Sequence, residues 1–182
     1  MACDITKGKA LLECKDAVSG LKAVYLSNFG EFEFAVGAGP GASLQEITGI
    51  TGATAADFYK YELKNSGNTF QQDITSSRDN GTTFFTQTLN FVLTKLSAEM
   101  EFQVKMMAWG RPQIIVEANS GTFFLMGREH GCEISGNSQL QGTMDSLNGY
   151  TLTGVGMEKE PIFYLQSSAI TFVTNNVSTN NI

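Results

Sequence analysis

The 182-residue sequence is poor in the residues that mark several large classes of protein. Its three cysteines, Cys3, Cys14 and Cys132, are odd in number and widely spaced, which predicts reduced thiols rather than a disulfide framework. No apolar run approaches the ~20 residues of a membrane-spanning helix, so no membrane partner is expected. Residues 1–14 carry charges and lack an apolar core segment, which predicts no signal peptide and folding in a cytosol.

Basic residues are scarce as well. Twelve Lys and Arg stand against eighteen Asp and Glu, which gives a formal net charge of -6. Nucleic-acid binding requires clustered cations that neutralise phosphates, and here the cations are scattered along the chain. The composition therefore disfavours a nucleic-acid-binding surface.

Reactive groups form no recognisable constellation. The single histidine, His130, lies two residues from Cys132, with Glu129 and Glu133 nearby, but a zinc site needs three or four well-placed ligands. Residues two apart on a strand have side chains that lie side by side and do not face each other, so Cys132 and His130 are poorly placed to act as a nucleophile and its base. The acids are dispersed, so no glycosidase pair stands out. We predict that the protein is not an enzyme and has no catalytic, cofactor-binding or metal-binding residue. His130 is expected in a turn, and Cys132 is expected to carry a buried thiol.

A glycine-rich segment, Gly37-Ala38-Gly39-Pro40-Gly41-Ala42, has the letters of a dinucleotide-binding fingerprint and Asp57 downstream. That fingerprint needs a helix opening on the phosphates, and Gly49 and Gly52 would break such a helix. We favour a long loop over residues 37–56.

What the sequence does contain is typical of strands joined by turns: thirteen Phe, nineteen Gly and only three Pro. Residues 82–94 alternate apolar and polar side chains, which predicts a long strand with one wet face. After this strand, apolar residues recur at helical spacing between Leu96 and Ala108. We predict a helix with Ser97 as its N-cap, ended by Gly110 and Pro112. A strand pair with its turn at residues 119–121 comes next.

The remaining segments complete an all-strand pattern. We predict a hairpin or bent strand over 21–36, a hairpin across Asn148-Gly149, and a last apolar strand pair at 162–165 and 169–173. A projecting hairpin arm is predicted over 58–81, with one turn at 65–68 and a second, Asp79-Asn80-Gly81, that leads into the long strand at 82–94. Residues 1–20 are expected to form an N-terminal arm and 174–182 an Asn-rich tail that is mobile or ordered only by a neighbour. The predicted fold is one domain, 1–182, mainly β (α+β): an antiparallel sandwich or open barrel of two sheets with one flanking helix and extended hairpin arms.

The helix has a second apolar stripe, formed by Phe102, Met106 and Trp109, on a flank separate from Met100 and Val104. Two interpretations are open: one wide helix face is buried in the core, or this stripe meets a neighbouring subunit.

Two stretches resemble structural proteins of tailed bacteriophages, in particular tail tube proteins. They are Lys95 to Gly127, with its helix, Gly-Arg-Pro, Ile-Ile-Val strand and aromatic strand ending Leu-Met-Gly, and Asn148 to Pro161, from Asn-Gly-Tyr-Thr-Leu-Thr to Glu-Lys-Glu-Pro. The resemblance, which extends to the tube protein of type VI secretion, implies two packed antiparallel sheets, one flanking helix and long arms. It also implies hexameric rings stacked into a hollow tube, a virion location after assembly in the host cytoplasm, and other tail or sheath proteins as partners.

Site residues follow from this resemblance as expectations. Thr86, Thr88 and Asn90 of the central strand would face the lumen, where a surface without cations lets double-stranded DNA pass without sticking. Subunit contacts are expected at Phe102, Met106, Trp109 and at the tip of the predicted arm, Asn65, Ser66, Gly67 and Asn68. Two alternatives remain: a terminator, hub or adaptor ring, and a carbohydrate- or receptor-binding sandwich using Tyr59, Tyr61, Asn65 and Asn68.

Overall fold

The computed structural model describes residues 8–10, 17–37, 45–52, 57–64 and 66–178. These contain eleven strands and two helices. In chain order they are β1 (Leu21–Ser27), β2 (Phe32–Val36), β3 (Glu46–Gly52), β4 (Tyr59–Glu62), β5 (Thr69–Ser77), β6 (Thr82–Thr94), α1 (Ala98–Trp109), β7 (Gln113–Ala118), β8 (Phe123–Met126), β9 (Glu133–Leu140), β10 (Asn148–Glu158), β11 (Phe163–Leu165) and α2 (Ser167–Asn175).

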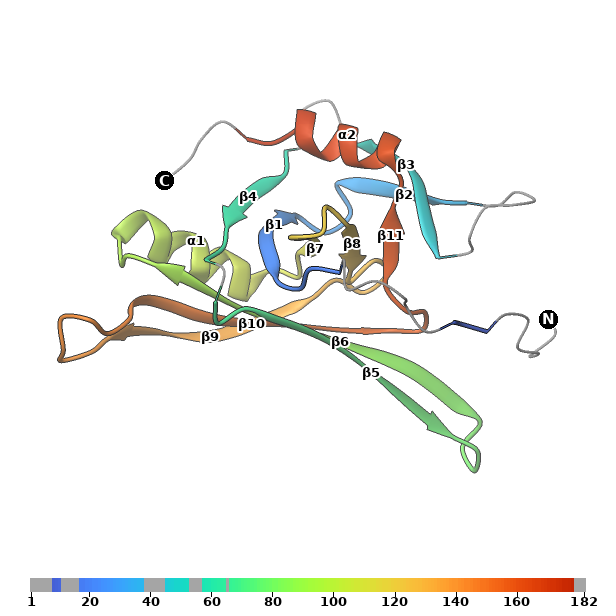
Figure 1. The fold of residues 1–182 in the computed structure, drawn as a ribbon, viewed down its shortest axis with the longest axis horizontal. Coiled ribbons are helices and arrows are strands. Elements are labelled where there is room, and N and C mark those ends of the chain that lie inside the picture. Colours follow the sequence, from blue (N-terminus) through green and yellow to red (C-terminus); the bar gives the residue numbers. More distant parts are fainter. Residues whose placement is uncertain (1–7, 11–16, 38–44, 53–56, 65, 179–182) are drawn as a thin grey trace.

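The strands form two sheets, which Figure 1 shows one above the other. The seven-stranded sheet has the order β2-β3-β11-β8-β7-β1-β4, and the four-stranded sheet has the order β5-β6-β10-β9. Every strand pair is antiparallel except β3 with β11. The predicted class, mainly β with two sheets in a sandwich or open barrel, is confirmed.

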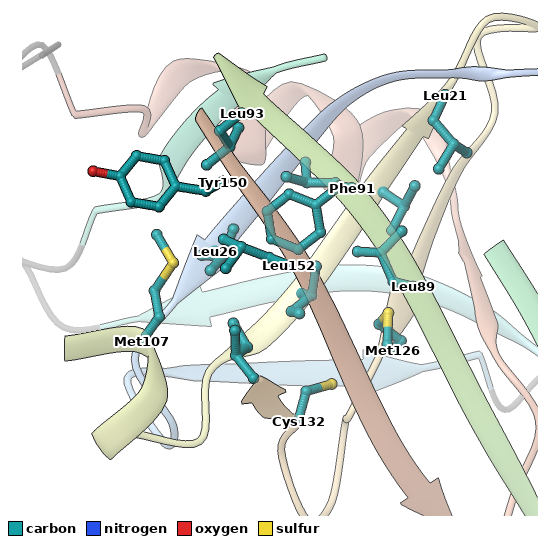
Figure 2. Packing of buried hydrophobic residues seen from close by; sticks show 14 of the residues in the cluster. Leu21, Leu26, Leu89, Phe91, Leu93, Met107, Met126, Cys132, Tyr150 and Leu152 are labelled. Carbon is teal, nitrogen blue, oxygen red and sulfur yellow. The ribbon is translucent and has the colours of Figure 1, made fainter. Parts of the chain in front are cut away.

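One core lies between the two sheets. Apolar side chains from one face of β1, β7 and β8 meet those of β6 and β10, and Met100 and Met107 of α1 close one end. Figure 2 shows Phe91 and Leu89 of β6 beside Leu152 of β10, with Met126 of β8 near them. The inward residues of β6 are the odd-numbered ones, as its alternation predicted.

A second core lies on the opposite face of the seven-stranded sheet, and α2 covers it. Ala169 and Val173 of α2 are fully buried there, four residues apart, against side chains such as Ile47 and Phe163. The predicted strand at 169–173 is therefore wrong: this segment is a helix that gives the sheet a third layer. The molecule has two helices, not one, among the residues that the structure describes.

Helix α1 begins and ends where the sequence predicted. The Ser97 side chain accepts a hydrogen bond from the Met100 backbone N–H at 3.1 Å, and the Gly110 N–H closes the last turn on the carbonyl of Met106. The turn at 119–121 between β7 and β8 is also as expected.

Of the two hairpins predicted over 58–81, the first is wrong, and the second, which turns at Asp79-Asn80-Gly81 into the long strand, is present as β5–β6. Strand β4 pairs with β1 in the seven-stranded sheet, whereas β5 pairs with β6 in the four-stranded sheet, so the chain leaves one sheet at Glu62 and enters the other at Thr69. The hairpin that does project is β5–β6, whose turn lies at 78–81 (Figure 1).

Two other predicted segments pair differently. Strands β1 and β2 do not form a hairpin, because β2 lies at the far edge of the sheet beside β3. The predicted loop at 37–56 contains β3, while 38–44 and 53–56 lie outside the described residues. Of the predicted N-terminal arm, the described residues 8–10 and 17–20 contain no helix or strand.

The Asn148-Gly149 pair is not a two-residue turn, because these residues begin β10 and the connection from β9 runs through 141–147. The Asn148 carbonyl accepts a hydrogen bond from the Lys95 N–H at 2.7 Å, and a Cβ on Gly149 would lie 2.0 Å from the Leu93 carbonyl oxygen. Glycine is needed here for close strand approach.

The C-terminal segment is better packed than expected. Phe58 donates its N–H to the Asn176 carbonyl at 2.8 Å and accepts from the Ser178 N–H at 2.9 Å. The interpretation of 174–178 as a mobile tail is therefore wrong, and 179–182 lie outside the described residues.

Candidate functional site

The outward face of the four-stranded sheet is polar and carries no Lys or Arg among the residues described. Its only charged side chains are the carboxylates Asp73 and Glu133. The set, called the outer face below, is Thr69, Gln71, Asp73, Thr75 and Ser77 of β5; Thr82, Phe84, Thr86, Thr88, Asn90, Val92 and Thr94 of β6; Gly149, Thr151, Thr153, Val155 and Met157 of β10; and Glu133, Ser135, Asn137 and Gln139 of β9.

Hydrogen bonds join the side chains of the outer face across three strands. The Thr153 hydroxyl donates to Asn90 Oδ1 at 2.7 Å, and Asn90 Nδ2 donates to Thr69 Oγ1 at 3.2 Å. Thr86, Thr88 and Asn90 are half-buried here, on one face as the strand parity predicted. This face is a neutral-to-acidic surface on which hydrogen bonds hold some of the polar side chains, Asn90 among them, in place.

The outer face ends at two edge strands, β5 and β9, which have no sheet partner on their far sides within the described residues. Strand directions alternate across β5-β6-β10-β9, so β5 and β9 run in opposite directions. An unpaired edge presents backbone donors and acceptors that can pair with another strand.

On α1, the second apolar stripe is exposed. Phe102 is 57%, Met106 46% and Trp109 73% accessible, while Met100 and Met107 on the other flank are buried in the core. This excludes the interpretation in which one wide helix face is simply buried. Within the part of the chain that the structure describes, the stripe is an exposed apolar surface.

A groove of about 460 Å³ runs between α1 and the ends of β1 and β4. Met106 and Trp109 line one side, and Phe29, Tyr59 and Tyr61 line the other. At its rim the Arg111 guanidinium stacks 4.2 Å from the Phe29 ring centroid, and Lys105 Nζ lies 4.3 Å from that of Trp109. Sequence reasoning missed Phe29 and Arg111, because only the pairing of β1 with β7 brings these distant residues together.

The segment expected at the tip of an arm has a structural role instead. Asn68 Oδ1 accepts the Val92 backbone N–H at 2.9 Å, just beyond the end of the β5–β6 ladder, and Asn68 Nδ2 donates to the Lys64 carbonyl. Ser66 and Gly67 are exposed beside it, and Asn65 lies outside the described residues. Asn68 does not join Tyr59 and Tyr61 in the groove.

His130 and Cys132 do not form one site. The Cys132 side chain is fully buried in the core between the sheets (Figure 2), and burial raises the pKa of its thiol. The His130 side chain is 66% exposed, and its Nδ1 lies 3.2 Å from a carboxylate oxygen of Glu158.

A buried polar cluster on the seven-stranded sheet has a structural explanation. The Glu117 carboxylate accepts hydrogen bonds from the Tyr25 hydroxyl at 2.8 Å and from Lys22 Nζ at 2.5 Å. Burial, followed by the bond to Glu117, raises the pKa of Tyr25, and that same carboxylate raises the pKa of Lys22. The two donors stabilise the buried charge of Glu117, and none of the three residues lines the groove.

No protein-family model matches the chain, and neither a curated protein nor a solved structure shows significant similarity to it. Among the described residues, neither helix is long and apolar enough to cross a membrane.

Proposed function

We propose that this protein is a bacteriophage tail tube subunit that assembles into stacked rings around a DNA-conducting channel. The observation that carries the proposal is the outer face, which has two carboxylates and no cation among the described residues. Duplex DNA binds proteins mainly through phosphate contacts to Lys and Arg, so a surface of this kind lets it slide. Thr86, Thr88 and Asn90 would lie at the centre of the channel wall.

Ring closure follows from the two unpaired edges of the same sheet. Because β5 and β9 run in opposite directions, β9 of one subunit can pair antiparallel with β5 of the next under cyclic symmetry. Closure into a continuous barrel would pair both edges of the four-stranded sheet and turn the outer face toward the lumen. The resemblance noted above favours six subunits in each ring.

Stacking of rings would use the apolar groups that the single chain leaves exposed. Figure 1 shows the β5–β6 hairpin extending from the end of the molecule opposite α1. Ile74 on this hairpin is 65% accessible, and α1 exposes Phe102, Met106 and Trp109 at the other end. Contacts between unlike ends repeat along an axis, which is how a stack grows.

Negative-stain imaging of the purified protein, with light scattering for mass, tests this proposal. We expect rings or tubes of even bore, and we expect Met106→Ser with Trp109→Ser to reduce stacking while the monomer keeps its unfolding midpoint. Glu99→Gln, also on α1, is the matched control. A protein that stays monomeric at every concentration and salt would contradict the proposal. Rings that never stack would instead favour a terminator, hub or adaptor ring.

The groove favours a second candidate, a carbohydrate- or receptor-binding module. Tyr59, Tyr61 and Trp109 provide aromatic faces, with the Gln103 amide and Arg111 nearby as hydrogen-bonding groups. Its volume is within the ~300–1,000 Å³ typical of ligand sites. A monomer that binds glycans and loses that binding on Trp109→Ser would replace the tube proposal with this one.

A further inference from the structure

A carboxylate at the end of β10 is held in a fixed orientation. Glu158 is only 4% exposed, and its Oε1 accepts the backbone N–H groups of Glu129 at 3.1 Å and His130 at 2.9 Å. Those two bonds direct its second oxygen, Oε2, at His130 Nδ1, 3.2 Å away. One oxygen therefore has backbone partners, and the other faces an imidazole that is open to solvent.

Glu129 supplies a third group. One potential ligand atom from each of Glu129, His130 and Glu158 lies within 4.8 Å of the other two. The side chains of Glu129 and His130 are 46% and 66% exposed, so both have room to close around an ion. Glu158 is the rigid member of the set and the other two are adjustable.

The surroundings of these three groups favour a cation. A cavity of about 10 Å³, roughly the size of one water, is lined by Glu129, Glu158 and Glu160. The one guanidinium in its lining, Arg128, lies 3.4 Å from Glu129 and 4.9 Å from the Phe163 ring centroid. The lining of this cavity therefore holds three carboxylates and one positively charged side chain, which favours a cation.

We infer that Glu129, His130 and Glu158 form a binding site for Zn²⁺, with water completing the coordination. Imidazole nitrogen and carboxylate oxygen are both zinc ligands, with bonds of about 2.0–2.2 Å. In a tetrahedron with such bonds, neighbouring ligand atoms lie about 3.3 Å apart, close to the present separation of His130 Nδ1 and Glu158 Oε2. Binding needs a neutral imidazole with its proton on Nε2, and it replaces the His130–Glu158 hydrogen bond by two bonds to the metal.

A bound ion would join the two sheets. Glu129 and His130 belong to the connection that leaves β8 of the seven-stranded sheet, and Glu158 ends β10 of the four-stranded sheet. The ion would therefore stabilise the sandwich against unfolding whether or not the protein assembles. This inference does not depend on the proposed tube function.

Calorimetric titration with ZnCl₂ of the full chain, first treated with a chelator, tests the site. The chain carries Cys3→Ser and Cys14→Ser to remove two thiols that could bind zinc by themselves. We expect one ion per chain and, with free zinc at about one hundred times Kd, a Tm higher by about 5–10 °C. His130→Ala, at an exposed side chain, is expected to weaken binding at least tenfold and, at the same zinc concentration, to cut the Tm shift to about half or less.

Glu133→Gln, three residues from His130 and on the outer face, is the matched control and should bind zinc like the parent chain. Glu129→Gln is the second ligand variant, again at an exposed position that leaves the fold intact. Absence of zinc binding, or equal affinity in the parent chain and His130→Ala, would overturn the inference.

Discussion

The two sheets differ in how many of their faces are covered. Strands β1, β7 and β8 of the seven-stranded sheet are buried on both faces, between the four-stranded sheet and α2. In the four-stranded sheet the central strands β6 and β10 are buried on one face and leave the other largely to solvent. The doubly covered strands contribute stability through both faces, so their sequence is constrained at most positions, with the exposed Lys22 of β1 as an exception. The singly covered sheet is free to use one face for function.

The same comparison can be made within strand β6, because its odd-numbered residues face the core and its even-numbered residues face the solvent. Phe91 is fully buried, and we expect Phe91→Ala to lower the free energy of unfolding by about 3–5 kcal/mol through lost burial and a cavity. Phe84, on the outer face and 37% accessible, is the matched residue, and Phe84→Ala should cost under about 1 kcal/mol. Urea unfolding of the monomer measures both; equal losses would show that the two faces are not distinct.

A smaller effect is expected from Tyr61 on the edge strand β4, which packs against the core shared by the sheets. Burial, with a smaller contribution from Tyr59, raises the pKa of Tyr61 to about 12, compared with about 10 in an unfolded chain. Between these values the unfolded chain loses its proton first, so the free energy of unfolding falls as pH rises, by up to about 1.4 kcal/mol per unit.

Tyr61→Phe removes this ionisation, so between pH 10 and pH 12 the variant should lose less stability than the parent chain. The measurement is urea unfolding at several alkaline pH values. The same pair at pH 7, where the phenol is protonated in both states, serves as the control. Parallel curves for parent and variant over the whole alkaline range would contradict a raised pKa at Tyr61.

Local signals in the sequence predicted β6 and α1. The alternation of β6 needs only that one face be wet, and α1 begins at the side chain of Ser97 and ends at Gly110, two residues whose effects are local. The polar parity of the outer face was predictable for the same reason. What the sequence could not provide is which strands lie at the edges of each sheet.

The missed elements depend on contacts between distant residues. The α2 segment is rich in Ile, Thr, Phe and Val, which favour strands, and it is a helix because Ala169 and Val173 cover the seven-stranded sheet. In β3, Gly52 resembled a loop residue, but a Cβ there would lie 2.5 Å from the Phe32 ring, so glycine permits β2 and β3 to pack closely. Similarly, the groove exists only because α1 is folded back over β1 and β4.

The smallest effect on stability is expected on the outer face, where the effect on function should be clearest. Thr86→Lys with Thr88→Lys places two cations at half-buried positions of β6 and should change the free energy of unfolding by about 1 kcal/mol or less. Asn90 is left in place because its amide joins Thr153 to Thr69. Thr86→Gln with Thr88→Gln is the neutral control, with side chains of similar length.

In assembled tubes the lysine variant should retain duplex DNA at low salt and release it as salt rises, since each phosphate contact releases a counterion and the gain from that release falls as the salt concentration rises. The glutamine variant and the parent should retain none at either salt. Gel-shift or sedimentation of tubes with labelled duplex DNA measures this. If lysines at these positions leave DNA retention unchanged, the outer face does not line the channel, and β5 and β9 must meet other partners than each other.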